Sequence, residues 1–210
     1  MSSAGISGLL EKLGFKKSSI VETIVTTLNP DGTVNPAPMG ISRGEGLILI
    51  IKPFKTSNTY RNLLKHPIAC INITSVPSFY LQTAFKDTQF IGLHQPRFNG
   101  VRMEQADAYI ILKKIDEKKL DESRVEFRFD IQGIERKNLK PKAFSRGDAA
   151  LVDAIIHVTR LEAFINQGKL DDARKARERF YLCKEVVNRV SKSEVILELS
   201  KLVDEWSIHL

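Results

Sequence analysis

Hydroxyl and cationic side chains gather in and just before one short segment, KTSNTYRN, whose pattern predicts the start of a helix. The members of this set are Lys52, Lys55, Thr56, Ser57, Thr59 and Arg61. Backbone N–H groups at a helix start lack intrahelical partners, and the helix dipole favours negative charge there. Nearby hydroxyls and cations can complete a site for a phosphate or another anion. The same residues are also typical of an ordinary capped helix with solvated lysines, so spacing alone leaves both interpretations open.

A proline-rich strand precedes this segment, in the stretch NPDGTVNPAPMG. The first half has turn chemistry, since Pro30 presets one backbone angle and Gly32 accepts a positive φ. In the second half, Pro36 and Pro38 have no N–H to donate to a neighbouring strand, and Gly40 weakens a strand. The pattern is typical of an edge strand that proline protects from aggregation. The alternative is a ligand against the strand, because Gly40 would permit the close approach of a flat ring.

Three polar residues share one face of a helix predicted in the C-terminal part of the chain. Asp153, His157 and Arg160 stand at positions i, i+4 and i+7, which places them on one side of the helix. A histidine on such a face is suited to donating a proton to a bound substrate. A solvated or internally paired polar face is the alternative, and the spacing does not decide between the two.

The sequence shows no ligand spacing typical of a metal site, no Ser-His-Asp order, no Walker loop and no Rossmann glycine pattern. Its two cysteines, Cys70 and Cys183, both stand in apolar settings. We interpret them as packing residues of a reduced, cytoplasmic chain, since two cysteines form neither a metal cluster nor a disulfide framework. The N-terminus has no secretory pattern, and no apolar run reaches the roughly 20 residues that span a bilayer.

The chain of 210 residues has a formal net charge of +7, which suits an anionic partner such as nucleic acid, a membrane surface or a phosphorylated ligand. Residues 169–192 are notably basic, with eight Lys or Arg and four Asp or Glu. The interleaved acids and a clean apolar stripe favour a solvated face of a helical bundle over a nucleic-acid surface. We therefore expect neither a nucleic acid nor a membrane as the partner.

The elements that must position these residues follow from hydrophobic periodicity. Strands are predicted at 18–28, 33–42, 47–52, 68–74, 106–116 and 123–135, with tight turns between the first three. A short amphipathic helix is predicted near the N-terminus, a second opens at Thr56 or Ser57 and ends before Pro67, and a third, short one falls in PSFYLQTAF. The segment GLHQPRFNG is predicted to be a loop, and the pattern is helical from about Ala143 onward.

This order predicts an α+β fold with a mainly β core. Residues 1–140 are expected to form a small antiparallel β-barrel with a short N-terminal helix. Residues 141–210 are expected to form a helical C-terminal region.

The order of motifs resembles the FMN-binding split barrel of pyridoxamine-phosphate oxidases and small flavin reductases. The oxidases open the corresponding helix with a Ser-Arg-Lys triplet that holds the FMN phosphate. Here Ser57, Asn58 and Thr59 stand at those places, so Ser57 matches and two cations are replaced. The phosphate must then be neutralised by Lys52, Lys55 or Arg61.

The chain more closely resembles a mainly archaeal family with this barrel and a helical C-terminal region. The matching stretches are NPDGTVNPAPMGI, FKTSNTYRNLL and AALVDAIIHVTRL, which cover the barrel and the first appended helix. The family typically has a Phe-Asn-Arg motif nearby, whereas this chain has Phe144-Ser145-Arg146, without the amide. The resemblance implies FMN binding by a homodimer with the ligand near the subunit interface.

The resemblance also assigns roles to the residues above. Thr56, Ser57 and Thr59 are expected to hold the phosphate with help from Lys55 and Arg61. The residues expected to run past the flavin ring are Ala37, Pro38, Met39, Gly40 and Ile41. His157 and Arg160 are the catalytic candidates.

The sequence thus predicts an FMN-dependent oxidoreductase of flavin-reductase type, with a reduced nicotinamide or another small carrier as electron donor. Two alternatives remain. One is a flavin-binding or sensing protein without catalysis, and the other is a basic nucleic-acid-binding module.

Overall fold

The computed structural model describes residues 3–17, 20–86, 90, 93–137, 146–190 and 193–206. The chain divides into two compact units, which we describe separately. The barrel unit comprises residues 1–74 and 96–139, and the helical unit comprises 75–95 and 140–210. One boundary between the units follows residue 139. Residues 75–95, however, belong to the helical unit although the sequence pattern grouped them with the barrel.

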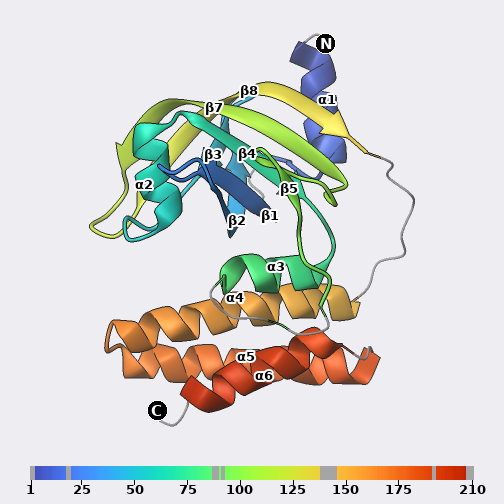
Figure 1. Ribbon diagram of the computed structural model, residues 1–210, viewed down its shortest axis with the longest axis vertical. Helices are drawn as coiled ribbons and strands as arrows, with labels where there is room; N and C mark the ends of the chain where they lie inside the picture. Colours follow the sequence, from blue (N-terminus) through green and yellow to red (C-terminus); the bar gives the residue numbers. More distant parts are fainter. Residues whose placement is uncertain are drawn as a thin grey trace. The chain divides into compact units, whose positions relative to one another are not determined.

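Six antiparallel strands close into a barrel in the first unit, as the sequence predicted (Figure 1). They are β1 (Ile20–Leu28), β2 (Val34–Arg43), β3 (Leu49–Ile51), β4 (Ile68–Ile73), β7 (Ala108–Lys119) and β8 (Val125–Arg136). Their order around the barrel is β1-β2-β3-β8-β7-β4, and β4 pairs with β1 to close it. With the helices that follow, the fold is α+β.

Two helices and a small hairpin complete the barrel unit. The helices are α1 (Ser3–Lys12) and α2 (Asn58–Lys65), and the hairpin is formed by β5 (Phe98–Asn99) and β6 (Arg102–Met103). The hairpin begins inside the segment predicted to be a loop, because two-residue strands are too short to show a period of two. Its turn uses Gly100 at a φ of 56°, a conformation that favours glycine.

Alternating side chains of the strands fill the barrel interior. Phe127 and Phe129 of β8 are fully buried there, with their ring centroids 6.5 Å apart. Leu10 of α1 and Phe15, just after that helix, join the same apolar cluster. The N-terminal helix is therefore part of the barrel core, as its apolar spacing indicates.

The register of the β1–β2 hairpin fixes the direction of each backbone group in β2. The hairpin closes with a hydrogen bond of 2.9 Å from Asn29 N–H to Thr33 O. Bonded and non-bonded pairs alternate along an antiparallel ladder, so every second residue from Thr33 onward directs its backbone groups to β1. The intervening residues, Pro36, Pro38 and Gly40, direct theirs away from β1.

On that outer side, β3 pairs with only the last three residues of β2, from Ile41 to Arg43. Among the described strands, none pairs with residues 34–40 on this side, and we call residues 34–40 the open segment of β2. Proline costs no ladder hydrogen bond there, because its missing N–H would have pointed to the unpaired side. The edge-strand interpretation agrees with this register.

A buried polar network ties helix α2 to the β1–β2 hairpin. The Asn35 side chain donates through Nδ2 to Thr27 Oγ1 and to Thr59 Oγ1, each at 3.2 Å. The Asn62 side chain donates to Thr27 Oγ1 at 3.0 Å and to Asn29 Oδ1 at 2.9 Å. Buried amides and hydroxyls need such partners, so the network fixes the position of α2 on the barrel.

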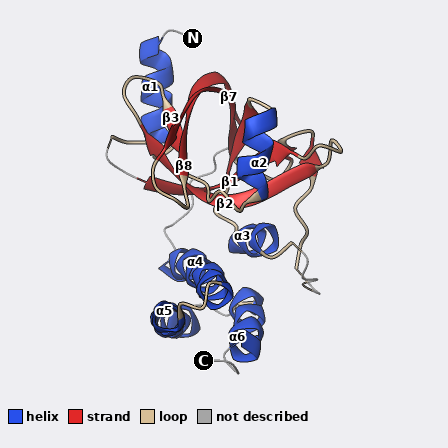
Figure 2. Ribbon diagram, turned by 90° about the vertical axis from the view of Figure 1, so that its left-hand side faces the viewer, coloured by secondary structure: helices blue, strands red, loops and turns tan. Residues whose placement is uncertain are grey.

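The helical unit contains α3 (Pro77–Ala84), α4 (Arg146–Asn166), α5 (Leu170–Val190) and α6 (Glu194–Trp206). The last three are the predicted C-terminal helices. Helices α4 and α5 pack side by side along their length (Figures 1 and 2), and Gly168, at a φ of 69°, forms the turn between them. Helix α3 packs on α4 and α6, and the rings of Phe85 and Trp206 lie 5.9 Å apart. This packing explains why residues 75–95 belong with the helices.

None of the helices that the structure describes combines the length and the apolar character needed to cross a bilayer.

Replacing Phe127 with alanine should lower the free energy of unfolding by about 3–5 kcal/mol, because it leaves a cavity in the barrel core. Phe54→Ala is the matched control, since the Phe54 side chain is 54% exposed, and it should cost less than about 1 kcal/mol. Chemical denaturation measures both. Equal losses would contradict the described core.

Replacing Asn62 with alanine should lower the free energy of unfolding by about 1–3 kcal/mol, because Thr27 and Asn29 lose a buried donor. Asn58→Ala makes the same change at an exposed position of the same helix and should stay within about 0.5 kcal/mol. The same denaturation assay compares them. If Asn62→Ala proved no worse than Asn58→Ala, the network would not stabilise α2.

Candidate functional site

Ser57 caps the N-terminus of α2. Its hydroxyl accepts a hydrogen bond from Tyr60 N–H at 3.2 Å and donates to Phe54 O at 2.7 Å. The Ser57 carbonyl accepts from Arg61 N–H at 3.3 Å. The helix itself leaves its first N–H groups, those of Asn58 and Thr59, without an intrahelical acceptor. This helix start has the donors that an anion requires.

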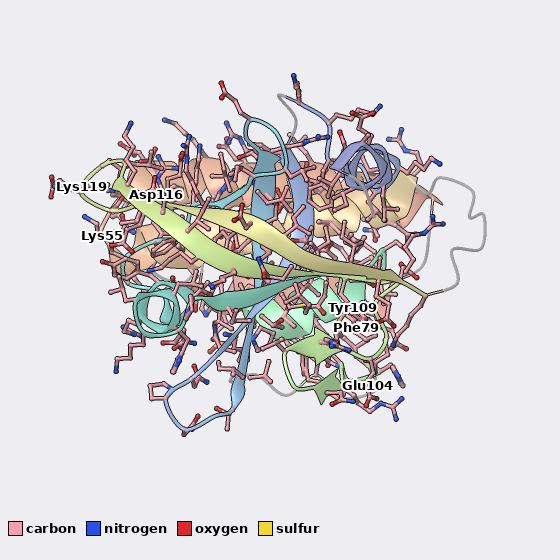
Figure 3. All side chains as sticks on the ribbon, turned by 90° about the horizontal axis from the view of Figure 1, so that it is seen from above. Lys55, Phe79, Glu104, Tyr109, Asp116 and Lys119 are labelled. Carbon is pink, nitrogen blue, oxygen red and sulfur yellow. The ribbon has the colours of Figure 1, made fainter. Side chains whose placement is uncertain are left out.

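Lys55 lies beside this helix start, where it contacts the turn between β7 and β8. Its ammonium donates to Glu122 O at 3.0 Å and to Asp121 O at 3.3 Å. Figure 3 shows Lys55 at the same end of the barrel as Lys119 of β7. An ammonium has three donors, and these two carbonyls leave one for another acceptor. Lys55 is therefore held in place while it keeps a donor for an anion.

The other two predicted cations, Lys52 and Arg61, each contact a side chain of the protein. Lys52 forms an ion pair with Glu126 at 3.4 Å, and Arg128 pairs with the same carboxylate at 3.1 Å. The guanidinium of Arg61 donates to the side chain of Asn58. The structure thus brings Lys55 and Arg61 to the start of α2, whereas the charge of Lys52 is balanced by a neighbouring strand.

The two predicted threonines differ in exposure. Thr56 is exposed just before the cap. Thr59 is only 1% exposed, and its hydroxyl accepts the hydrogen bond from Asn35. The Thr59 hydroxyl therefore belongs to the buried network, and Thr59 can reach a bound phosphate through its backbone N–H alone.

The strand predicted to face a ligand lies mostly within the open segment of β2. Residues Ala37 to Gly40 are half-buried, and Ile41 is fully buried in the barrel core. A Cβ added to Gly40 would lie 2.8 Å from Ile20 Cγ2. A side chain at this position would therefore displace Ile20 of β1, which is 71% exposed.

Asp153, His157 and Arg160 share a face of α4 as their spacing predicted, but they lie in the helical unit. Burial lowers the pKa of His157, Asp153 acts to raise it, and the charges of Arg160 and Arg179 lower it further. The imidazole Nδ1 exposes less than 1 Å² and has no hydrogen-bond partner among the described residues. His157 is therefore favoured in its neutral form.

The sequence did not predict that three possible metal-ligand atoms would lie together near this face. A carboxylate oxygen of Asp153, an imidazole nitrogen of His157 and Sγ of Cys183 all lie within 4.8 Å of one another. Cys183 belongs to α5, and the sequence pattern placed it in the apolar stripe of that helix. Of the Phe144-Ser145-Arg146 motif, the first two residues lie outside the described part, and α4 begins at Arg146.

Sequence reasoning also missed Thr27, Asn35 and Asn62. Each is 3% exposed or less. Asn62 stands beside two leucines in RNLLK, and an amide next to an apolar run was the available signal. Its partner could not be named, because Thr27 and Asn62 meet only when the helix packs on the hairpin.

Comparison with the solved structure of a similar protein supports the described fold. An FMN-bound family protein from Methanosarcina mazei is 20% identical, with a TM-score of 0.67, and the match covers 94% of this chain and 99% of that one. The flavin reductase of styrene monooxygenase from Pseudomonas putida S12 is 9% identical, with 56% and 79% covered and a TM-score of 0.47. The flavin reductase PheA2 is 14% identical, with 61% and 87% covered and a TM-score of 0.47.

No curated protein sequence matches the chain significantly. A family model described as "Protein of unknown function (DUF447) N-terminal domain" matches residues 21–138, which is more than half of the chain. That range begins in β1 and runs past the end of β8, so it takes in all six barrel strands. The Methanosarcina mazei protein carries the same family designation. This chain belongs to the DUF447 family.

Proposed function

We propose that this protein binds FMN on its barrel unit and works as an oxidoreductase of the flavin-reductase type. One observation carries the proposal: the capped start of α2 lies beside the open segment of β2. The hydrogen bond from Asn35 Nδ2 to Thr59 Oγ1, at 3.2 Å, joins the two elements. One element offers donors to a phosphate, and the other offers backbone groups to a flat polar ring.

The phosphate of FMN is suited to the start of α2. It would accept from the N–H groups of Asn58 and Thr59 and from the remaining donor of Lys55. Thr56 adds an exposed hydroxyl, and Arg61 adds a positive charge one turn into the helix. These groups combine the helix dipole with charge-assisted hydrogen bonds. They compensate for the two cations that the oxidases have in the Ser-Arg-Lys triplet.

The flavin ring is suited to the open segment of β2. The C=O groups of Pro36 and Pro38 point away from β1, on the side where no described strand pairs with them. A flavin has donors and acceptors along its pyrimidine edge, so it can bond to such a backbone as a strand would. The chain from Ala37 to Ile41 would then run past the ring.

The family relationship supports the same ligand. The solved Methanosarcina mazei protein is FMN-bound, and the match covers nearly the whole of both chains. When bound, FMN would accept a hydride from a donor such as a reduced nicotinamide. The barrel residues would bind and orient it. The catalytic role of His157 and Arg160 stays a prediction. The homodimer with FMN near its interface also stays a prediction, and light scattering can test whether the protein is a dimer in solution.

The phosphate site predicts different effects on FMN and on riboflavin, which lacks the phosphate. Lys55→Ala removes the ammonium that faces the phosphate. It should weaken FMN binding about tenfold or more, because a hydrogen bond to a charged group contributes about 1.5–3 kcal/mol. Riboflavin affinity should stay within about twofold. Flavin fluorescence quenching measures both.

Lys65→Ala is the matched control, because Lys65 is exposed in the last turn of the same helix. It should leave both affinities unchanged. If Lys55→Ala weakened riboflavin and FMN binding equally, Lys55 would not contact the phosphate. A wild-type protein that binds neither flavin would refute the proposed function as a whole.

The proposed activity predicts steady-state oxidation of NADH or NADPH when FMN is present. The loss of nicotinamide absorbance measures this oxidation. Rates should rise with FMN concentration until the site is filled. Tight FMN binding without turnover by any reduced donor would favour the non-enzymatic flavin-binding alternative. Salt-dependent retention on nucleic acid by a flavin-free protein would favour the basic nucleic-acid module.

A further inference from the structure

The helical unit contains a second group of chemically reactive side chains, at the contact between α4 and α5. These helices form a hairpin about Gly168, and Asp153 and Cys183 are each fifteen residues from that glycine. In an antiparallel hairpin, residues at equal distances from the turn lie at the same level. His157 stands one turn along α4 from Asp153, so all three side chains reach the same place.

Their donor atoms are close enough to share one ligand. The carboxylate oxygen, the imidazole nitrogen and the thiol sulfur lie within 4.8 Å of one another. Bonds of about 2.0–2.3 Å to a tetrahedral zinc ion place ligand atoms about 3.3–3.8 Å apart. Closing the site therefore needs side-chain movements of about 1 Å, which a half-buried cysteine and an exposed aspartate permit.

The state of His157 is a second, independent observation. Its Nδ1 is buried without a hydrogen-bond partner among the described residues. Buried polar atoms rarely lack a partner, and a bound ion, a ligand or a water molecule can supply the one that is missing. A metal bound through this nitrogen would supply the partner.

We propose that Asp153, His157 and Cys183 bind one Zn²⁺ ion, with water in the fourth position. Nitrogen, sulfur and carboxylate oxygen are the donors that zinc prefers. The Cys183 thiol releases its proton to solvent as the sulfur binds, so the thiolate and the carboxylate together neutralise the ion. Binding links α4 to α5. All three ligands belong to the helical unit, and metal binding can be measured without FMN.

Nearby charged side chains affect how tightly the site binds zinc. Arg160 and Arg179 both act electrostatically on His157, and both are exposed to solvent. Their positive charge opposes a cation, although solvent screens it. With three protein ligands and these two guanidinium groups, the site should bind zinc more weakly than a closed four-ligand site.

The test uses the full-length chain, treated with a chelator and then titrated with Co²⁺, whose spectrum reports both sulfur ligation and geometry. We expect one equivalent to bind, with a thiolate-to-cobalt charge-transfer band and the intense d–d bands of four-coordination in the difference spectrum. Zn²⁺ should displace the cobalt and raise the unfolding temperature. Failure to bind one equivalent, or binding without the charge-transfer band, would overturn the proposal.

Three variants assign the ligands. Cys183→Ser should abolish the charge-transfer band, whereas Asp153→Asn and His157→Gln should keep it but weaken Co²⁺ binding about tenfold or more. Cys70→Ala is the matched control, because Cys70 is fully buried in the barrel unit, where burial raises the pKa of its thiol to about 12. It should leave the titration unchanged. A band that survives Cys183→Ser would place the cobalt on another thiol and refute the site.

Discussion

Two prolines in β2 set the constraint on which the proposed FMN site depends. Proline has no N–H, so a strand cannot pair fully on the side to which Pro36 and Pro38 point. The register of the hairpin directs both residues away from β1, and β3 pairs with β2 only beyond residue 40. The barrel therefore closes at one end of β2 and leaves a backbone edge at the other. Any ligand that bonds like a strand can use this edge.

The helix that completes this site is fixed by polar packing. Buried amides of Asn35 and Asn62 meet the hydroxyls of Thr27 and Thr59 between the helix and the hairpin. Such groups are costly to bury unless they are paired, so the arrangement tolerates little displacement. The helix start is thereby held next to the open segment, so in the proposed FMN site the phosphate and the ring would meet adjacent groups. Preorganisation of this kind lowers the entropy that binding costs.

The helical unit has chemistry of its own, which the sequence shows only in part. The spacing of Asp153 and His157 is visible in the sequence, because it depends on the helical repeat alone. Cys183 has the position of an ordinary packing residue in its helix, and its relation to the other two appears only when the hairpin about Gly168 is formed. The sulfur, the imidazole and the carboxylate then form one donor set.

The sequence by itself determined the main elements and their order, apart from the short β5–β6 hairpin. Alternation in the strands, the Ser57 cap and the turn glycines are local signals, and they predicted the barrel, the helix start and the three C-terminal helices. Only the tertiary structure decided how residues far apart in the chain meet. The Thr59 hydroxyl is buried beneath its helix, and the side chain of Ile20 lies next to Gly40. Residues 75–95 belong with the helices. The physical reason is that side-chain contacts between elements depend on packing and register, which periodicity within one element does not encode.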